Sequence, residues 1–141
     1  MGERRKAREN ALQILFQLEF SSDDCEEVIE EYWKDKKATK KTKDYANWLV
    51  KGVISSKDKI DNIIESTSEH WRLSRMATVD RNVLRIAVFE LLYEPDVPHP
   101  IIINEAIEIA KKFSTEEAGH FVNGILDSIR KKLREGEENE K

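Results

Sequence analysis

Residues 83–92 read VLRIAVFELL, and eight of these ten residues are apolar. A helix that is apolar on almost every face is buried among other elements. Its two charged residues, Arg85 and Glu90, are five positions apart and do not face each other on a helix. We expect each of them to pair with a neighbouring helix. The stretch therefore predicts the central helix of a helical bundle.

The confinement of the prolines to one short segment after this stretch favours an all-α fold. All three fall within residues 94–100, and no β-like alternation of apolar and polar residues is sustained elsewhere. Apolar positions at helical spacing and capping residues predict the elements. The expected helices cover residues 4–20, a shorter segment after Ser22 and Asp23 that contains Val28 and Trp33, 42–67 (as one helix or as two with a kink near Ser55-Ser56), 74–76 after a Ser74 cap, 83–92, 103–113, and a last helix that begins with a Ser114/Glu117 capping box.

Charge and length limit the class of protein. The 141 residues hold 24 Lys and Arg against 28 Asp and Glu, a net charge of −4, so a nucleic-acid surface must be a local patch. No apolar run approaches the roughly 18 residues of a membrane span, and no secretory signal follows the N-terminus, so we expect a cytoplasmic protein. Cys25 is the only cysteine, which excludes an internal disulfide and a multi-thiolate metal site.

The sequence does not predict an enzyme. Its histidines, His70, His99 and His120, are not spaced to share one metal on a helix face. There is no phosphate-binding glycine loop and no nucleophile elbow. We therefore expect no catalytic residues, no metal and no cofactor.

The N-terminus is locally basic. Residues 1–8 hold four cations against Glu3, a local charge of +3, and helical spacing places two of the arginines on an edge that leads to Phe16. Arginines bind phosphates and an exposed aromatic ring stacks on a base, so an RNA contact is one interpretation. The alternative is a solubilising helix start with Phe16 in the core. Residues 34–43, with six lysines against one aspartate, predict a solvated loop that attracts phosphates nonspecifically.

Two glycines near the C-terminus interrupt a helical pattern. Gly119 and Gly124 flank Phe121 and Asn123, and each costs about 1 kcal/mol relative to alanine in a helix interior. Either close helix packing or the close approach of a ligand beside Phe121 would account for these glycines.

Several strings resemble the NusB family of transcription antitermination factors. They are VDRNVLRIAVFELLYEPDVPHPIIINEAIEIAKKF, GHFVNGILDSI and the N-terminal RRKARENALQILFQLEF. The resemblance implies one all-α domain of two packed three-helix bundles, at about 1–70 and 71–134, with a charged, frayed tail at 135–141. It also implies pairing with NusE, a small-subunit ribosomal protein, and binding of boxA in nascent RNA. The assembly would act on the RNA polymerase elongation complex through other Nus factors and promote read-through, notably of ribosomal RNA operons.

The resemblance also implies roles for individual residues. The expected RNA contacts are Arg4, Arg5, Lys6, Arg8, Phe16, Arg72, Arg75, Phe121 and Asn123. Asp80 and Arg81 are candidates for the surface that meets NusE. Two alternatives remain: the similar N-terminal domain of a ribosomal RNA methyltransferase, and a helical interaction module or homodimeric scaffold without specific RNA binding. Specific RNA binding separates the scaffold from the others, and turnover of a methyl donor identifies the enzyme.

Overall fold

The computed structural model describes residues 2–68 and 72–140, with side chains up to residue 136 in the last helix, and is all-helical in these ranges. The prediction of an all-α fold is confirmed. The elements are α1 (Gly2–Glu19), α2 (Cys25–Trp33), α3 (Lys40–Ser55), α4 (Lys57–Thr67), the 3-10 turn η1 (Leu73–Arg75), α5 (Thr78–Tyr93), α6 (His99–Phe113) and α7 (Glu116–Glu140).

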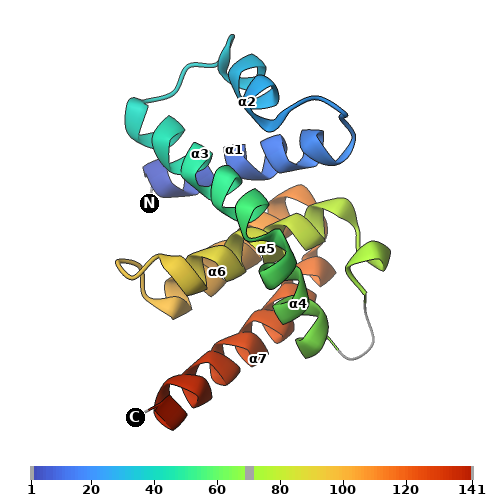
Figure 1. Cartoon of the computed structure of the whole chain (residues 1–141), viewed down its shortest axis with the longest axis vertical. Coiled ribbons are helices and arrows are strands. Elements are labelled where there is room, and N and C mark those ends of the chain that lie inside the picture. Colours follow the sequence, from blue (N-terminus) through green and yellow to red (C-terminus); the bar gives the residue numbers. More distant parts are fainter. Residues whose placement is uncertain (1, 69–71, 141) are drawn as a thin grey trace.

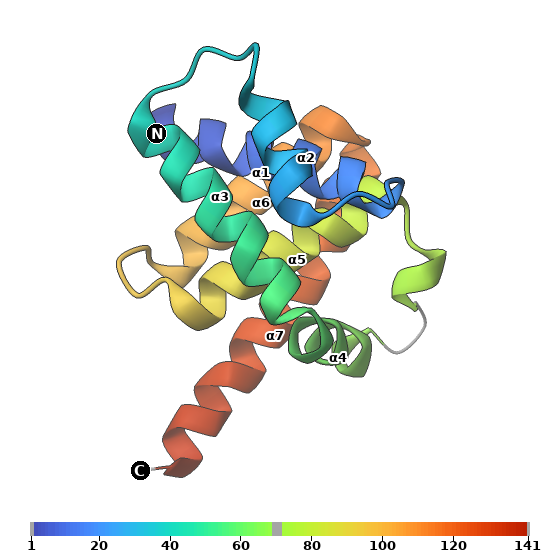
Figure 2. The ribbon, with the colours of Figure 1, turned by 45° about the horizontal axis from the view of Figure 1, so that its top comes forward.

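The helices form two packed groups of three, α1–α3 and α5–α7 (Figure 1). The short helix α4 packs against α5 and α7, so it belongs beside the second group and not, as the expected boundary near residue 70 implied, within the first. The C-terminal part of α7 extends away from the other helices (Figure 2). No helix in the described ranges is long and apolar enough to cross a membrane.

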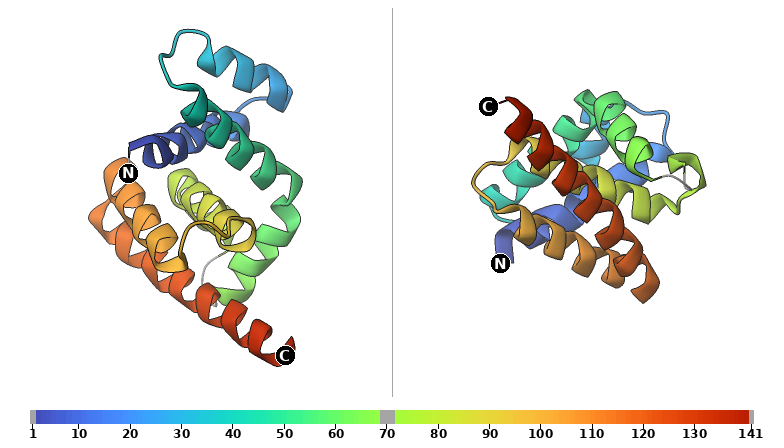
Figure 3. Two further views of the ribbon diagram at one scale, coloured as in Figure 1. Left: turned by 90° about the vertical axis from the view of Figure 1, so that its left-hand side faces the viewer. Right: turned by 90° about the horizontal axis from the view of Figure 1, so that it is seen from below.

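Helix α5 is the centre of the fold, as its sequence predicts. Every residue from Asn82 to Leu91 is buried. In the left view of Figure 3, α5 lies in the middle, with α1 and α3 on one side, α6 and α7 on another, and α4 on a third. A helix surrounded in this way positions residues at both of its ends, and both ends reach the surface.

The long segment before α5 is two helices. Helix α3 ends and α4 begins at Ser56, so of the two alternatives that the sequence left open, the structure shows the one with two helices. The predicted loop is shorter than expected, because Thr39 caps α3 by accepting a hydrogen bond from the Thr42 N–H at 3.1 Å. The last lysines of the run, from Lys40 on, therefore lie on a helix.

Other predicted boundaries are wrong for local reasons. The α7 cap is Thr115, whose Oγ1 accepts from the Ala118 N–H at 3.0 Å, and not Ser114. Ser74 lies inside η1 and does not cap it. Helix α6 begins at His99, four residues early, because proline is well tolerated in a first helical turn. The charged residues from Glu135 to Glu140 continue α7 and do not form a separate tail.

Packing explains one of the two C-terminal glycines. A Cβ at buried Gly119 would lie 2.9 Å from Cγ of Lys111, so this position brings α7 close to α6. A Cβ at Gly124 would meet nothing within 4 Å, and nothing in the structure explains that glycine.

Candidate nucleic-acid interface

The cations at the start of α1 have different surroundings. Arg4 and Lys6 are exposed, Arg5 is half-buried, and Arg8 lies in the core. The predicted edge of α1 runs from the arginines to Phe16, and burial of Arg8 and Leu12 interrupts its exposed part. The N-terminal cluster is therefore not one continuous basic surface.

Arg8 is held by a carboxylate from α5. Its Nε lies 2.7 Å from Glu90 Oε1, and its Nη2 lies 2.8 Å from Glu90 Oε2. Burial by itself disfavours the charged guanidinium, but the hydrogen bonds and charge of Glu90 outweigh it and raise the pKa of Arg8. Because its donors are occupied inside the protein, Arg8 stabilises the fold and presents no surface for a phosphate.

Glu90 also accepts a hydrogen bond from α3. The Tyr45 hydroxyl donates to Glu90 Oε2 at 2.8 Å and to Glu94 Oε2 at 3.3 Å. Burial, followed by the negative charge of Glu90, raises the pKa of Tyr45. One carboxylate thus joins α1, α3 and α5, and Glu90 pairs with neighbouring helices as predicted.

Ion pairs align α1 with α6. Arg5 donates from Nε to Glu105 Oε1 at 3.1 Å, and its Nη2 bonds to Glu105 Oε2. This hydrogen bonding holds the pKa of Glu105 below its usual range, despite burial of the carboxyl group. Further along, Lys112 pairs with Glu9 at 3.1 Å. The seam between the two helices therefore contains both signs of charge.

The far end of α1 carries two exposed aromatic rings. Phe16 and Phe20 are both exposed, and their ring centroids lie 5.0 Å apart in a tilted arrangement. Phe16 is therefore a surface residue and not a core residue. The sequence analysis did not identify Phe20 as a candidate site residue, although an aromatic residue four positions after Phe16 lies on the same helix face.

A groove at the N-terminal end of α5 brings three of the predicted site residues together: Arg75, Asp80 and Phe121. It has a volume of about 250 Å³. Its lining comes from η1, α5 and the start of α7 and consists of Arg75, Met76, Ala77, Asp80, Thr115, Glu117, Ala118 and Phe121.

Asp80 gives this groove its chemical character. Its Oδ1 is buried, yet no group in the described ranges donates a hydrogen bond to it. A buried carboxylate oxygen without a donor is unfavourable, and a bound molecule that brings an N–H or O–H group would satisfy it. The groove thus brings together the Asp80 carboxyl group, the Arg75 guanidinium and the Phe121 ring.

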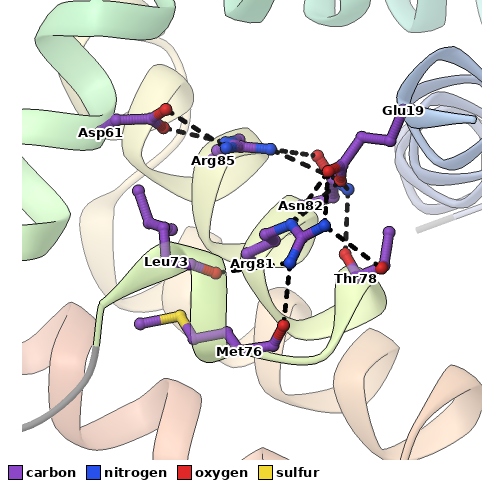
Figure 4. Close-up of polar contacts among 8 residues, drawn as sticks. All are labelled: Glu19, Asp61, Leu73, Met76, Thr78, Arg81, Asn82 and Arg85. Carbon is purple, nitrogen blue, oxygen red and sulfur yellow. Dashed lines mark hydrogen bonds and ion pairs between the residues drawn. The ribbon is translucent and has the colours of Figure 1, made fainter.

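Arg81 does not line the groove, but it holds η1, which does, against α5. Its guanidinium donates to the carbonyl oxygens of Met76 at 2.9 Å and Leu73 at 3.4 Å, which fixes η1 against α5 (Figure 4). It also pairs with Glu19 of α1, with Nη2 2.6 Å from Oε1. Arg81 therefore orders the residues that line the groove, and most of its donors are used within the chain.

Glu19 is the centre of a second charged cluster. Burial opposes its charge, but hydrogen bonds from Arg81 and Asn82 outweigh this and lower the pKa of Glu19. Arg85 lies 3.6 Å from Glu19 and also donates to Asp61 of α4 at 2.8 Å (Figure 4). The predicted pairing of Arg85 with neighbouring helices is confirmed.

Comparison with known proteins identifies the family. The sequence pattern of the NusB family matches residues 5–131. A transcription antitermination protein NusB from Myxococcus xanthus is 47% identical over 133 residues, which cover 92% of this chain and 95% of that protein. The chain belongs to the NusB family.

Solved NusB structures have the same fold. NusB from T. maritima matches with a TM-score of 0.84 at 46% identity, covering 91% of this chain and 90% of that chain. A structure of the antitermination factors NusB and NusE in complex with dsRNA matches with a TM-score of 0.83 at 31% identity, covering 93% and 98% of the two chains.

The groove does not include two further residues that the NusB resemblance suggested, although both belong to neighbouring parts of the chain. Arg72 is exposed and lies just before η1, and Asn123 is exposed on α7 two residues after Phe121. Conversely, Thr115 and Met76 line the groove without having been singled out. In the sequence, Thr115 stands only inside the predicted Ser114/Glu117 capping box, and Met76 carried no functional signal.

No cluster of three or more metal-binding side chains occurs in the parts of the chain that the structure describes. His99 and His120 lie in those parts, and His70 lies outside them.

Proposed function

We propose that this chain is an RNA-binding transcription antitermination factor that recognises boxA RNA through the Asp80 groove together with NusE. The assembly acts on the RNA polymerase elongation complex through other Nus factors and promotes read-through, notably of ribosomal RNA operons. Family membership and the relative solved with NusE and RNA support this proposal.

The observation that carries the proposal is the buried Asp80 Oδ1, which lacks a donor in the described ranges. Amino groups of nucleobases and ribose 2′-hydroxyls are donors of the required kind. Phe121 adds a ring that can stack on a base, and Arg75 adds a phosphate partner. The three side chains together match the chemistry of an unpaired nucleotide.

The Arg4, Arg5 and Lys6 contacts remain part of the proposal at the other end of α1. Arg4 and Lys6 are exposed, and none of the described carboxylates forms an ion pair with either. Arg8 is omitted from the proposed RNA surface because Glu90 holds its guanidinium. Arg72, Phe16 and Asn123 are exposed and remain candidate contacts, while NusE docking beside Asp80 and Arg81 remains a prediction.

Titration of a boxA-containing RNA, with and without saturating NusE, tests the function. We expect specific binding that a scrambled RNA of equal length does not reproduce. Arg75→Ala should weaken binding, whereas Arg134→Ala, which removes the same charge from an exposed site on α7, should not. Equal affinity for boxA and scrambled RNA under both conditions would favour the scaffold alternative.

A further inference from the structure

Four aromatic rings form a continuous strip at the C-terminal end of α5. The aromatic strip consists of Tyr45 and Trp48 from α3 and Phe89 and Tyr93 from α5. Successive ring centroids lie 5.4, 4.8 and 5.0 Å apart. Trp48 is 38% exposed and Tyr93 is 40% exposed, whereas Phe89 between them is buried. The Trp48 and Tyr93 rings are thus partly exposed to solvent, and both pack against the buried Phe89 ring.

Gly52 leaves room for the Phe89 ring. A Cβ at Gly52 would lie only 2.0 Å from Cζ of Phe89, so the Phe89 ring occupies the space above the α3 backbone. From there it contacts both exposed rings, Trp48 and Tyr93. Both rings therefore rest on a packed partner.

Cations flank the strip at both ends. The Arg4 guanidinium lies 5.4 Å from the Tyr45 ring centroid, and the Lys59 ammonium lies 5.5 Å from that of Tyr93. Lys59 Nζ also donates to the Tyr93 hydroxyl at 3.3 Å, which lowers the pKa of Tyr93. Neither cation forms an ion pair with a carboxylate in the described ranges, so both retain charge for a ligand.

A hollow of about 410 Å³ continues the surface beyond Trp48. Its lining combines the Tyr45 and Trp48 rings with two cations and two carboxylates, namely Arg4, Lys41, Glu3 and Asp44. Glu3 accepts a hydrogen bond from Thr39 Oγ1 at 2.8 Å. Lys41 belongs to the run at 34–43, which holds six lysines against one aspartate.

We propose that the aromatic strip is a second binding surface for single-stranded RNA, with bases stacked on Trp48 and Tyr93 and phosphates near Arg4, Lys41 and Lys59. The inference rests on the proposed function, since it extends the path of an RNA bound at the Asp80 groove. Surfaces for single strands combine stacking rings with cations that follow the backbone. The centres of protein interfaces are depleted in charge, whereas here a cation lies beside each end of the strip.

The strip and the groove are separate sites. Asp80 and Tyr93 are 13 residues apart on one helix, a distance of about 20 Å along α5 at about 1.5 Å per residue. Of the boxA contacts proposed above, Arg4 alone borders the strip, at its Tyr45 end. Stacking on both Trp48 and Tyr93 therefore needs a longer RNA than boxA. This separation makes RNA length the variable that distinguishes the two sites.

The first test compares two RNAs, boxA alone and boxA with a single-stranded uridine extension, on the full chain and on Trp48→Ala/Tyr93→Ala. We expect the extension to tighten binding to the unmodified chain. The double variant should lose about tenfold or more of that gain in affinity, and its affinity for boxA alone should stay the same. Lys59→Ala should reduce the salt dependence for the extended RNA by about 0.7 in log–log slope. Lys57→Ala, the same change two residues earlier on α4, should not.

A second measurement reports on the ring itself. The tryptophan emission of the chain minus that of Trp48→Phe isolates the signal of Trp48, and stacking on a base quenches it. We expect quenching by the extended RNA and none by boxA alone. Circular dichroism and urea unfolding of each variant confirm that it is folded.

The outcomes separate the two proposals. Normal boxA binding with no gain from the extension, or with the same gain in the double variant, overturns the strip alone. Loss of NusE binding in the double variant, with the RNA gain intact, assigns the strip to a protein and also overturns it. Failure of RNAs of both lengths to bind, with or without NusE, overturns the proposed function and the strip together.

Discussion

Arg8 and Glu90, 82 positions apart in the sequence, form a two-bonded ion pair in the core, where their side chains are only 4% and 1% exposed. A pair buried this deeply is stabilising only while both charges are present, because either one alone is strongly unfavourable in the interior. It fixes α1 against the central helix.

Arg8→Ala should lower the free energy of unfolding by about 3–5 kcal/mol, because it leaves Glu90 buried without its cation. Lys6→Ala, at an exposed site on the same helix, should change it by less than about 0.5 kcal/mol. Urea unfolding measures both. Equal stability of the two variants would contradict the assigned role, and Arg8→Met/Glu90→Leu should recover much of the loss.

Phe121→Ala should weaken RNA binding by about 1–3 kcal/mol if the ring stacks on a base in the Asp80 groove. The ring is only partly buried, so the loss of stability should fall below the roughly 3–5 kcal/mol of a core phenylalanine. Thermal unfolding beside an RNA titration separates the effects. A large drop in melting temperature with unchanged RNA affinity would assign the ring to packing.

Glu105 should make the fold sensitive to acid. Its folded pKa is lowered by the hydrogen bond from Arg5, so its contribution to stability is complete above the unfolded value of about 4.3 and is lost as the pH falls through the folded value. The unfolding free energy of Glu105→Gln should therefore depend less on pH in that acidic window. The pH dependence of the unfolding free energy of Glu30→Gln, at an exposed site, should match that of the unmodified chain. The same pH dependence in Glu105→Gln, Glu30→Gln and the unmodified chain would contradict the role of Glu105.

Gly52→Ala should destabilise the fold by about 1–3 kcal/mol, because the added Cβ overlaps the Phe89 ring. The same change in a Phe89→Leu background should be close to neutral. Gly124→Ala, where a Cβ meets open space, should instead stabilise α7 by up to about 1 kcal/mol. A stabilising Gly52→Ala would show that Phe89 moves aside without cost.

NusE and RNA should strengthen each other's binding. The chain has a net charge of −4 and its exposed N-terminal cations are few, so RNA alone should bind weakly. We expect a coupling of about 1–3 kcal/mol, equal in both directions because equilibrium linkage is reciprocal. Titrations of RNA with and without NusE, and of NusE with and without RNA, measure it. Unequal factors would point to a second equilibrium, and equal affinities with and without the partner would exclude cooperation.

Periodicity predicted the elements well and their contacts less well. The segment around Val83 was assigned to the centre because its apolar residues cover every face, a property of the local sequence. Ser114 and Thr115 are adjacent and chemically alike, so pattern alone chose the wrong cap. The first turn of α6 was missed because prolines were taken as loop residues.

The candidate site was only partly predictable for a different reason. Burial of Arg8 depends on a carboxylate 82 residues away, which no local window contains. The groove likewise joins Arg75, Asp80 and Phe121 from three elements, and the missing donor at Asp80 Oδ1 emerges only once they are packed. The family resemblance supplied these residues, but it did not supply their geometry.

The buried position of Arg8 has a practical consequence for mutagenesis of the basic N-terminus. Arg4, Arg5, Lys6 and Arg8 look like one functional unit in the sequence, and neutralising them all at once is the natural experiment. Such a variant would confuse two causes, since it removes a core charge along with surface cations. A loss of RNA binding could then report a damaged scaffold, so informative charge-neutralised variants must keep Arg8.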